Sequence, residues 1–80
     1  MHLAWYRHRP SCGAVVHLHS PWLTALSCLP CSTPENCLPP LTPYYVMRVG
    51  QLPLLPYFKP GHEGIASALS EIAADHTAAL

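Results

Sequence analysis

The apolar residues of this 80-residue chain recur in short segments that prolines and glycines separate. Some segments repeat every three to four residues, as helices do, and others are β-branched or alternating, as strands are. Proline ends or opens several of them. The predicted elements are a helix over residues 2–8, a strand from Ala14 to His19, a helix from Pro21 to about Leu29, a short helix from Tyr44 to Val49, a strand from Leu52 to Phe58 and a helix from Ile65 to Ala74.

Two of the predicted helices have an apolar stripe, and we expect both stripes to lie in a core. The helix that follows Ser20 and Pro21 has its stripe at the spacing i, i+3, i+4 and i+7, with Ser20 as N-cap. This stripe consists of Trp22, Ala25, Leu26 and Leu29. The stripe of the last helix consists of Ile65, Ala68, Leu69, Ile72 and Ala73. With Glu71 and Asp75 outward, the last helix is expected to pack on a sheet.

Candidate chemistry enters with the strand Ala14–His19, because it contains His17 and His19 two residues apart. Successive side chains of a strand point to opposite faces, so both imidazoles are expected on one face. Val16 and Leu18 would then face a core. Imidazole nitrogens bind zinc, and the pair is therefore a candidate for half of a metal site.

The flanks of this pair resemble the zinc-binding segment of the class II aldolase/adducin family. Arg9-Pro10, the run from Gly13 to Val16, His17, His19 and Ser20 stand at the positions of that segment. Ser11-Cys12 replaces its more usual Asp-Ala. In the second half, the proline and glycine spacing from Leu38 to Gly61 resembles the sugar-acid branch, the 3-oxo-tetronate 4-phosphate decarboxylases.

The resemblance implies an α/β fold, a partial three-layer class II aldolase-like fold in which helices flank short strands. It also implies a metal, zinc or another divalent ion such as manganese, held by three histidines, of which His17 and His19 match two. The implied reaction is aldol cleavage or decarboxylation of a phosphorylated sugar or sugar acid through an enediolate. A cytoplasmic homo-oligomer, tetramer-like, is what the family leads one to expect.

The resemblance also implies that residues 1–80 are a fragment of a single domain. The family's phosphate-binding loop and catalytic glutamate would lie before Met1, and its third histidine would lie after Leu80. His76 does not match that third histidine. No catalytic residue is therefore assigned, and we expect the chain to have no lyase activity. Strands without their neighbours would leave it marginally stable or prone to aggregate.

Composition limits the other possibilities. Only 10% of the residues are charged and the formal net charge is zero, so neither nucleic acid nor a membrane surface is an expected partner. Half of the residues are hydrophobic. No stretch is long and apolar enough for a membrane-spanning helix.

The four cysteines keep two alternatives open. Cys28 and Cys31 have the spacing of a zinc knuckle, and with His17 and His19 they could form a small zinc-binding module. Order and spacing both depart from the usual pattern, in which the cysteine pair comes before a later histidine pair. An even number of cysteines in a small chain also permits a disulfide-bonded secreted protein.

Overall fold

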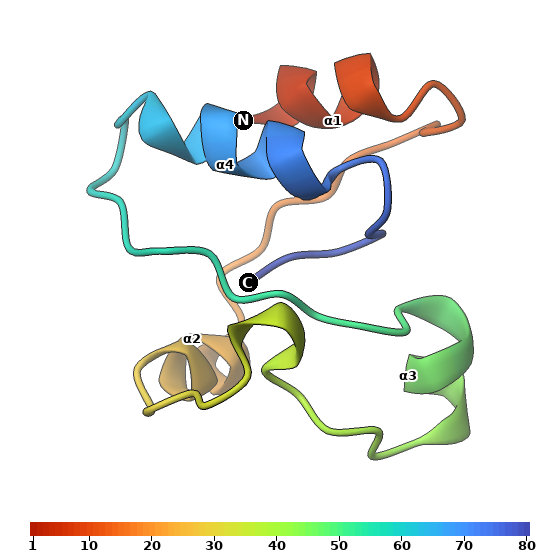
Figure 1. The fold of residues 1–80 in the computed structure, drawn as a ribbon, viewed down its shortest axis with the longest axis vertical. Helices are drawn as coiled ribbons and strands as arrows, with labels where there is room; N and C mark the ends of the chain where they lie inside the picture. The colour runs from red at the N-terminus through yellow and green to blue at the C-terminus, as the bar shows by residue number, and fades with distance from the viewer.

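A computed structural model describes all 80 residues, and it divides them into two layers of short helices (Figure 1). In one layer, the first and last helices lie side by side; the other layer holds the helices from the middle of the chain. The last residues of the chain run between the layers. The elements are α1 (His2–His8), α2 (Pro21–Ser27), the 3-10 helix η1 (Pro34–Asn36), α3 (Pro43–Arg48) and α4 (Gly64–Ile72).

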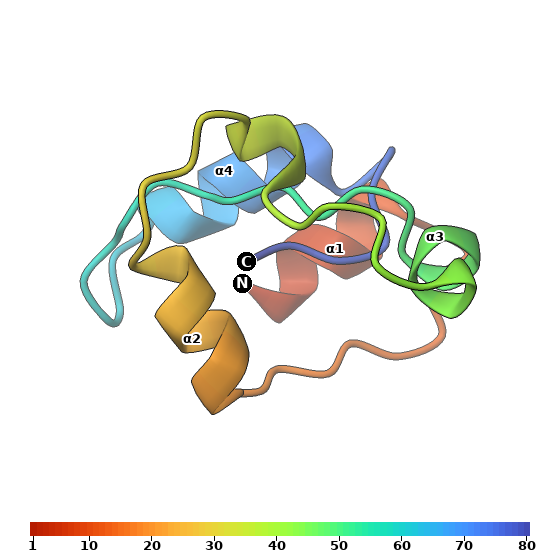
Figure 2. The same ribbon diagram turned by 90° about the horizontal axis from the view of Figure 1, so that it is seen from below.

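The core lies between α1 and α4, which remain adjacent when the molecule is turned (Figure 2). Trp5 of α1 is 8% exposed, and it packs with Ala4 against Leu69 and Ala73, the latter fully buried. Leu69, the one buried residue of α4, and Ala73, its C-cap, both belong to the stripe predicted from the spacing. Glu71 and Asp75, predicted to point outward, are exposed.

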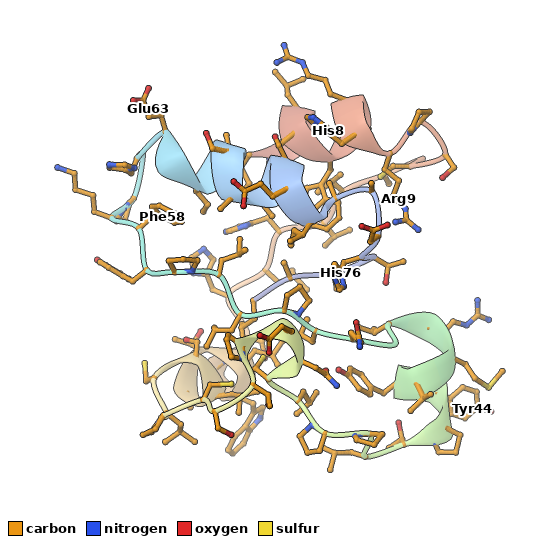
Figure 3. The ribbon with its side chains drawn as sticks, viewed as in Figure 1. His8, Arg9, Tyr44, Phe58, Glu63 and His76 are labelled. Carbon is orange, nitrogen blue, oxygen red and sulfur yellow. The ribbon has the colours of Figure 1, made fainter.

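Arg9 joins α1 to the end of α4. Its guanidinium Nη1 donates to the carbonyl oxygens of Ala73, Ala74 and His76 at 3.4, 3.2 and 3.0 Å. Ala73 is the C-cap residue of α4, and Ala74 and His76 lie directly after it. Carbonyls at the C-terminal end of a helix carry its partial negative charge, which a nearby cation offsets. Arg9 therefore binds the C-terminal end of α4 from a position 64 residues earlier in the chain, and Figure 3 shows Arg9 and His76 at the same end of this layer.

Of the two middle helices, α2 begins at Pro21 as predicted, and α3 begins at Pro43, one residue before the predicted start. Ser20 Oγ accepts from the Leu23 N–H at the start of α2, and Thr42 Oγ1 accepts from the Tyr45 N–H at the start of α3. A proline occupies the first turn of each helix. Gly50 follows α3 with φ +77°, the left-handed conformation that glycine adopts without strain after a helix.

A small hydrogen-bond network holds α3 against the two segments that flank it. The Tyr45 hydroxyl donates to the Leu38 carbonyl at 3.2 Å and to Asn36 Oδ1 at 3.4 Å. The same Oδ1 accepts from the Leu52 N–H at 3.1 Å. The side-chain amide of Asn36 therefore connects η1 with α3 and with the segment after α3. A backbone hydrogen bond from the Cys37 N–H to the Leu52 carbonyl, 2.9 Å long, adds to this connection.

The prediction of two strands is wrong for this chain, because neither Ala14–His19 nor Leu52–Phe58 forms a strand. From Val16 to His19, no backbone group makes a hydrogen bond within the chain. A strand exists only when a neighbour completes its ladder. One fragment of a ladder does form: the Leu80 N–H donates to the Pro53 carbonyl and the Leu55 N–H to the Leu80 carbonyl, the pattern of a parallel pair.

Two packing predictions are also wrong. The stripe of α2 is not core, since Trp22 is 86% exposed and Leu29 and Ala25 are exposed as well. The apolar face of α4 packs on α1 and not on a sheet, since no sheet forms. Val16 and Leu18, expected to face a core, are 75% and 77% exposed.

None of the helices has both the length and the apolar character that crossing a membrane would require.

Candidate functional site

The two histidines of the predicted metal site lie on the extended segment that joins α1 to α2. Two contacts fix its start. The Tyr6 hydroxyl accepts a hydrogen bond from the Val15 N–H at 3.1 Å, and the Val15 side chain packs against the α1–α4 core. The other end of the segment is fixed by Ser20, which caps α2. The backbone between these anchors is extended, and this determines where the imidazoles point.

The structure brings His17 and His19 together. Their Nε2 atoms are 2.9 Å apart, and their ring centroids are 4.8 Å apart with 74° between the planes. At this distance the N–H of one ring donates a hydrogen bond to the ring nitrogen of the other. The two rings therefore lie on the same side of the segment, as the spacing predicts.

The donor set fits one half of a zinc site. With Zn–N bonds of about 2.0 to 2.1 Å, two nitrogens bound to a tetrahedral ion are about 3.3 to 3.4 Å apart. The observed 2.9 Å separation needs to open by only a few tenths of an ångström. A metal ion would then take the place of the shared proton. Both side chains are exposed, so this adjustment meets no packing barrier.

The histidine pair borders a cavity of about 410 Å³ between the extended segment and the α1–α4 layer. His2, the first residue of α1, also lines it, and its ring lies 6.2 Å from that of His17, centroid to centroid. Arg9 is also one of the residues that line this cavity, and it is positively charged. The apolar part of the lining includes Trp5, Val15, Leu55, Ile65, Leu69 and Leu80.

No group of three or more His, Cys, Asp or Glu side chains is placed so that it could hold a metal ion. The pair His17 and His19 therefore lacks further protein donors in this chain. The same finding gives the zinc module no support, because Cys28 and Cys31 do not join the two histidines. The four cysteines are free thiols, and the structure gives the disulfide alternative no support.

Two acidic groups away from this site have shifted pKa values. Burial raises the pKa of the Cys37 thiol, and the neighbouring Cys31 thiol raises it further. Burial also raises the pKa of the Tyr45 hydroxyl, with a smaller contribution from Cys37. Both shifts favour the neutral form, so these groups are poorly suited to act as nucleophiles.

Residues 1–80 match the model of the family described as the Class II Aldolase and Adducin N-terminal domain. The chain therefore belongs to the class II aldolase and adducin family. Within it, the chain is 57% identical over 79 residues to the 3-oxo-tetronate 4-phosphate decarboxylase of Escherichia coli K12, and 56% identical over 69 residues to that of Haemophilus influenzae. These matches cover 99% and 86% of this chain.

Solved structures agree with this relationship. The crystal structure of YgbL from Escherichia coli, described as an aldolase/epimerase/decarboxylase, matches 99% of this chain with a TM-score of 0.94 at 57% identity. YgbL from Klebsiella pneumoniae matches with the same TM-score at 54% identity. The fold is therefore class II aldolase-like. The chain spans 37% of the length of the Escherichia coli decarboxylase and 38% of either YgbL chain.

Sequence reasoning identified the histidine pair but missed the residues that support it. Tyr6 and Arg9 are 9 and 64 residues away from the groups they bind, and no local pattern predicts such contacts. The one available signal was the helical register, which places His2, Trp5, Tyr6 and Arg9 at steps of three to four residues.

Proposed function

We propose that this chain is the part of a 3-oxo-tetronate 4-phosphate decarboxylase-like lyase that supplies two of the histidine ligands for its metal ion. The observation that supports the proposal is the 2.9 Å separation of the His17 and His19 Nε2 atoms beside the 410 Å³ cavity. The names of the relatives give the substrate class, a phosphorylated sugar acid.

In this proposal, His17 and His19 bind the ion as neutral imidazoles, and the remaining donors come from outside these residues. The divalent ion, zinc or manganese, would supply Lewis acidity that polarises a substrate oxygen. The Tyr6–Val15 hydrogen bond keeps the segment extended, and Arg9 keeps α1 against α4. In this proposal the chain contributes two correctly spaced imidazole ligands and one wall of the cavity. No residue of the chain is assigned to proton transfer.

The same proposal includes three further inferences. Residues 1–80 act as a piece of one class II aldolase-type domain, they have no lyase activity alone, and the complete enzyme is a cytoplasmic homo-oligomer. The support for these inferences is the family match together with the 37% share of the relatives' length.

Metal titration tests the ligand assignment. We expect the purified, reduced chain to bind Zn²⁺ weakly, and His17→Ala or His19→Ala to weaken binding at least tenfold, about 1.4 kcal/mol. His62→Ala is the matched control, because His62 is exposed and lies in a different loop, stacked on Phe58. Isothermal titration calorimetry gives the affinities.

Two results would contradict the proposal. Equal affinity in the wild type and in the double variant His17→Ala/His19→Ala would remove the ligand pair. Tight one-to-one binding that Cys28→Ser or Cys31→Ser abolishes would instead favour the zinc module. Decarboxylation of 3-oxo-tetronate 4-phosphate by the isolated chain, measured as released carbon dioxide, would overturn the expectation that it has no activity alone.

A further inference from the structure

His17 is the middle member of a row of three imidazole rings. Its Nε2 atom is hydrogen bonded to that of His19. Its ring also meets the ring of His2 edge to face, with 6.2 Å between the centroids and 66° between the planes. The His2 side chain is exposed, and its ring takes part in no hydrogen bond within the chain. Both nitrogens of His2 are therefore available to a partner, and the ring has space to turn towards His17.

Helix α1 holds His2 beside the extended segment. Tyr6 lies four residues after His2, on the same face of the helix. Its hydroxyl accepts a hydrogen bond from the Val15 N–H at 3.1 Å, two residues before His17. Trp5 of the same helix is buried in the core. The packing of α1 and the hydrogen bond of Tyr6 thus keep the two rings near each other, at the wall of the same cavity.

Metal coordination places a requirement on the other side of each ligand ring. A neutral imidazole that binds an ion through Nε2 carries its proton on Nδ1. Metal-bound histidines almost always donate this N–H to an acceptor, which fixes the orientation of the ring. In His17 the Nε2 edge faces His19, so the Nδ1 edge is the one left for a second partner. His2 is the side chain in ring contact with His17 that offers an acceptor nitrogen.

We propose that His2 is a positioning residue for the metal pair, and that its ring accepts a hydrogen bond from the Nδ1–H of His17 when His17 binds the ion through Nε2. The inference rests on the proposed function, because it takes His17 and His19 as ligands. His2 does not bind the ion itself, since no three His, Cys, Asp or Glu side chains are placed to hold one. It acts through His17, by limiting the rotation of that ring and keeping its proton on Nδ1.

Zinc titration of three variants of the 80-residue chain tests this role. His2→Leu removes the acceptor, whereas His2→Gln provides an amide oxygen in its place. His8→Leu is the matched control, because His8 is an exposed histidine of the same helix that binds the Ala4 carbonyl. A short Gly/Ser extension before Met1 keeps a free terminal amine away from His2. We expect His2→Leu to weaken zinc affinity roughly 10- to 100-fold, and His2→Gln and His8→Leu to stay within about threefold of the wild type.

Nuclear magnetic resonance provides a readout that a purely structural role of His2 would not change. At saturating zinc, the ¹⁵N signals of the imidazoles should show coordination at Nε2 of His17 and His19 and none at His2. The Nδ1 proton of His17 should exchange slowly with water in the wild type and in His2→Gln. In His2→Leu it should exchange as an exposed imidazole N–H does, while the far-ultraviolet circular dichroism stays that of the wild type.

Several results would overturn the role of His2. These are unchanged zinc affinity in His2→Leu, an equal loss in His2→Gln, or zinc coordinated by a His2 nitrogen, which would make His2 a ligand. If His2→Leu does not fold, the wild-type spectrum decides, because fast exchange of the His17 Nδ1 proton would exclude an acceptor. If His17→Ala weakens binding and His2→Leu does not, this inference alone fails. If His17→Ala leaves the affinity unchanged, the proposed ligand pair fails as well.

Discussion

The α1–α4 layer and the α2–α3 layer use the same kind of amphipathic sequence and reach opposite outcomes. In the first layer, Trp5 and Leu69 are 8% and 4% exposed. In the second, neither α2 nor α3 contains a buried residue, and Trp22 is 86% exposed. Tyr44 of α3 points away from the molecule in Figure 3. The spacing of apolar residues therefore indicates that a helix face is suited to burial. Whether that face is buried depends on a second element that packs against it.

The difference lies in what holds each layer. The first is held by side-chain packing between segments more than 60 residues apart, with Arg9 as a polar clamp. The second is held by local caps at Ser20 and Thr42 and by the hydrogen bonds of Asn36. Packing is non-local and cooperative, whereas a cap adds a small local increment.

Truncating Leu69 should produce the largest effect. Leu69→Ala removes a buried side chain from the α1–α4 core, and we expect it to lower the free energy of unfolding by about 2 to 5 kcal/mol. Leu29→Ala, the same change at an exposed position beyond α2, should stay within about 0.5 kcal/mol of the wild type. Urea unfolding followed by circular dichroism at 222 nm measures both. Equal losses would show that α2 is as well packed as α4.

Replacing Arg9 tests the hydrogen bonds that connect α1 to the end of α4. Arg9→Ala should lower the free energy of unfolding by about 1 to 2 kcal/mol, because the carbonyls at the end of α4 lose a charged donor in a partly exposed setting. Arg7→Ala is the control, since Arg7 is exposed on α1. Thermal unfolding of the two variants compares them. A destabilisation by Arg7→Ala as large as that by Arg9→Ala would contradict the role of the clamp.

The cap of α3 should matter less. Thr42→Ala removes the acceptor of the Tyr45 N–H and should cost about 0.5 to 1 kcal/mol. Thr42→Ser keeps the hydroxyl and should change little. Hydrogen exchange of the α3 amides is the sensitive measurement, because the loss is expected to be confined to the second layer. A similar loss in α1 and α4 would show that the layers unfold as one unit.

High pH should lower the stability of the α2–α3 layer, and this should be the smallest of the four predicted effects. The pKa of Cys37 is raised in the folded chain, so its thiol ionises less readily there than in the unfolded chain. The associated stability is complete below pH 9.0 and declines as the pH rises through the raised value. Tyr45, whose pKa is also raised, acts in the same direction above pH 10.0.

The variant Cys37→Ser should flatten this alkaline decline. Serine has a similar size and does not ionise in this range. Urea unfolding at a series of pH values from 7 to 10.5, under reducing conditions, measures the slope of stability against pH. An unchanged slope in Cys37→Ser would exclude the thiol as the source.

Much of the local structure could be predicted from sequence, because its causes are local. The caps and prolines at Ser20-Pro21 and Thr42-Pro43 start α2 and α3, and Gly50 ends α3 in the left-handed conformation. The two-residue spacing of His17 and His19 places both rings on one side of an extended segment. The family was also evident from the run of residues around these histidines.

What the sequence could not decide is which faces find a partner. The strands from Ala14 to His19 and from Leu52 to Phe58 were predicted from β-branched and alternating residues, but a strand requires hydrogen bonds to a second segment. The α2 stripe was likewise predicted to be buried, but no other element covers it. Only the tertiary structure shows that α4 packs on α1, that Arg9 caps α4 and that Val16–His19 keeps its backbone groups free. Each of these results depends on contacts between segments distant in sequence, which no local pattern specifies.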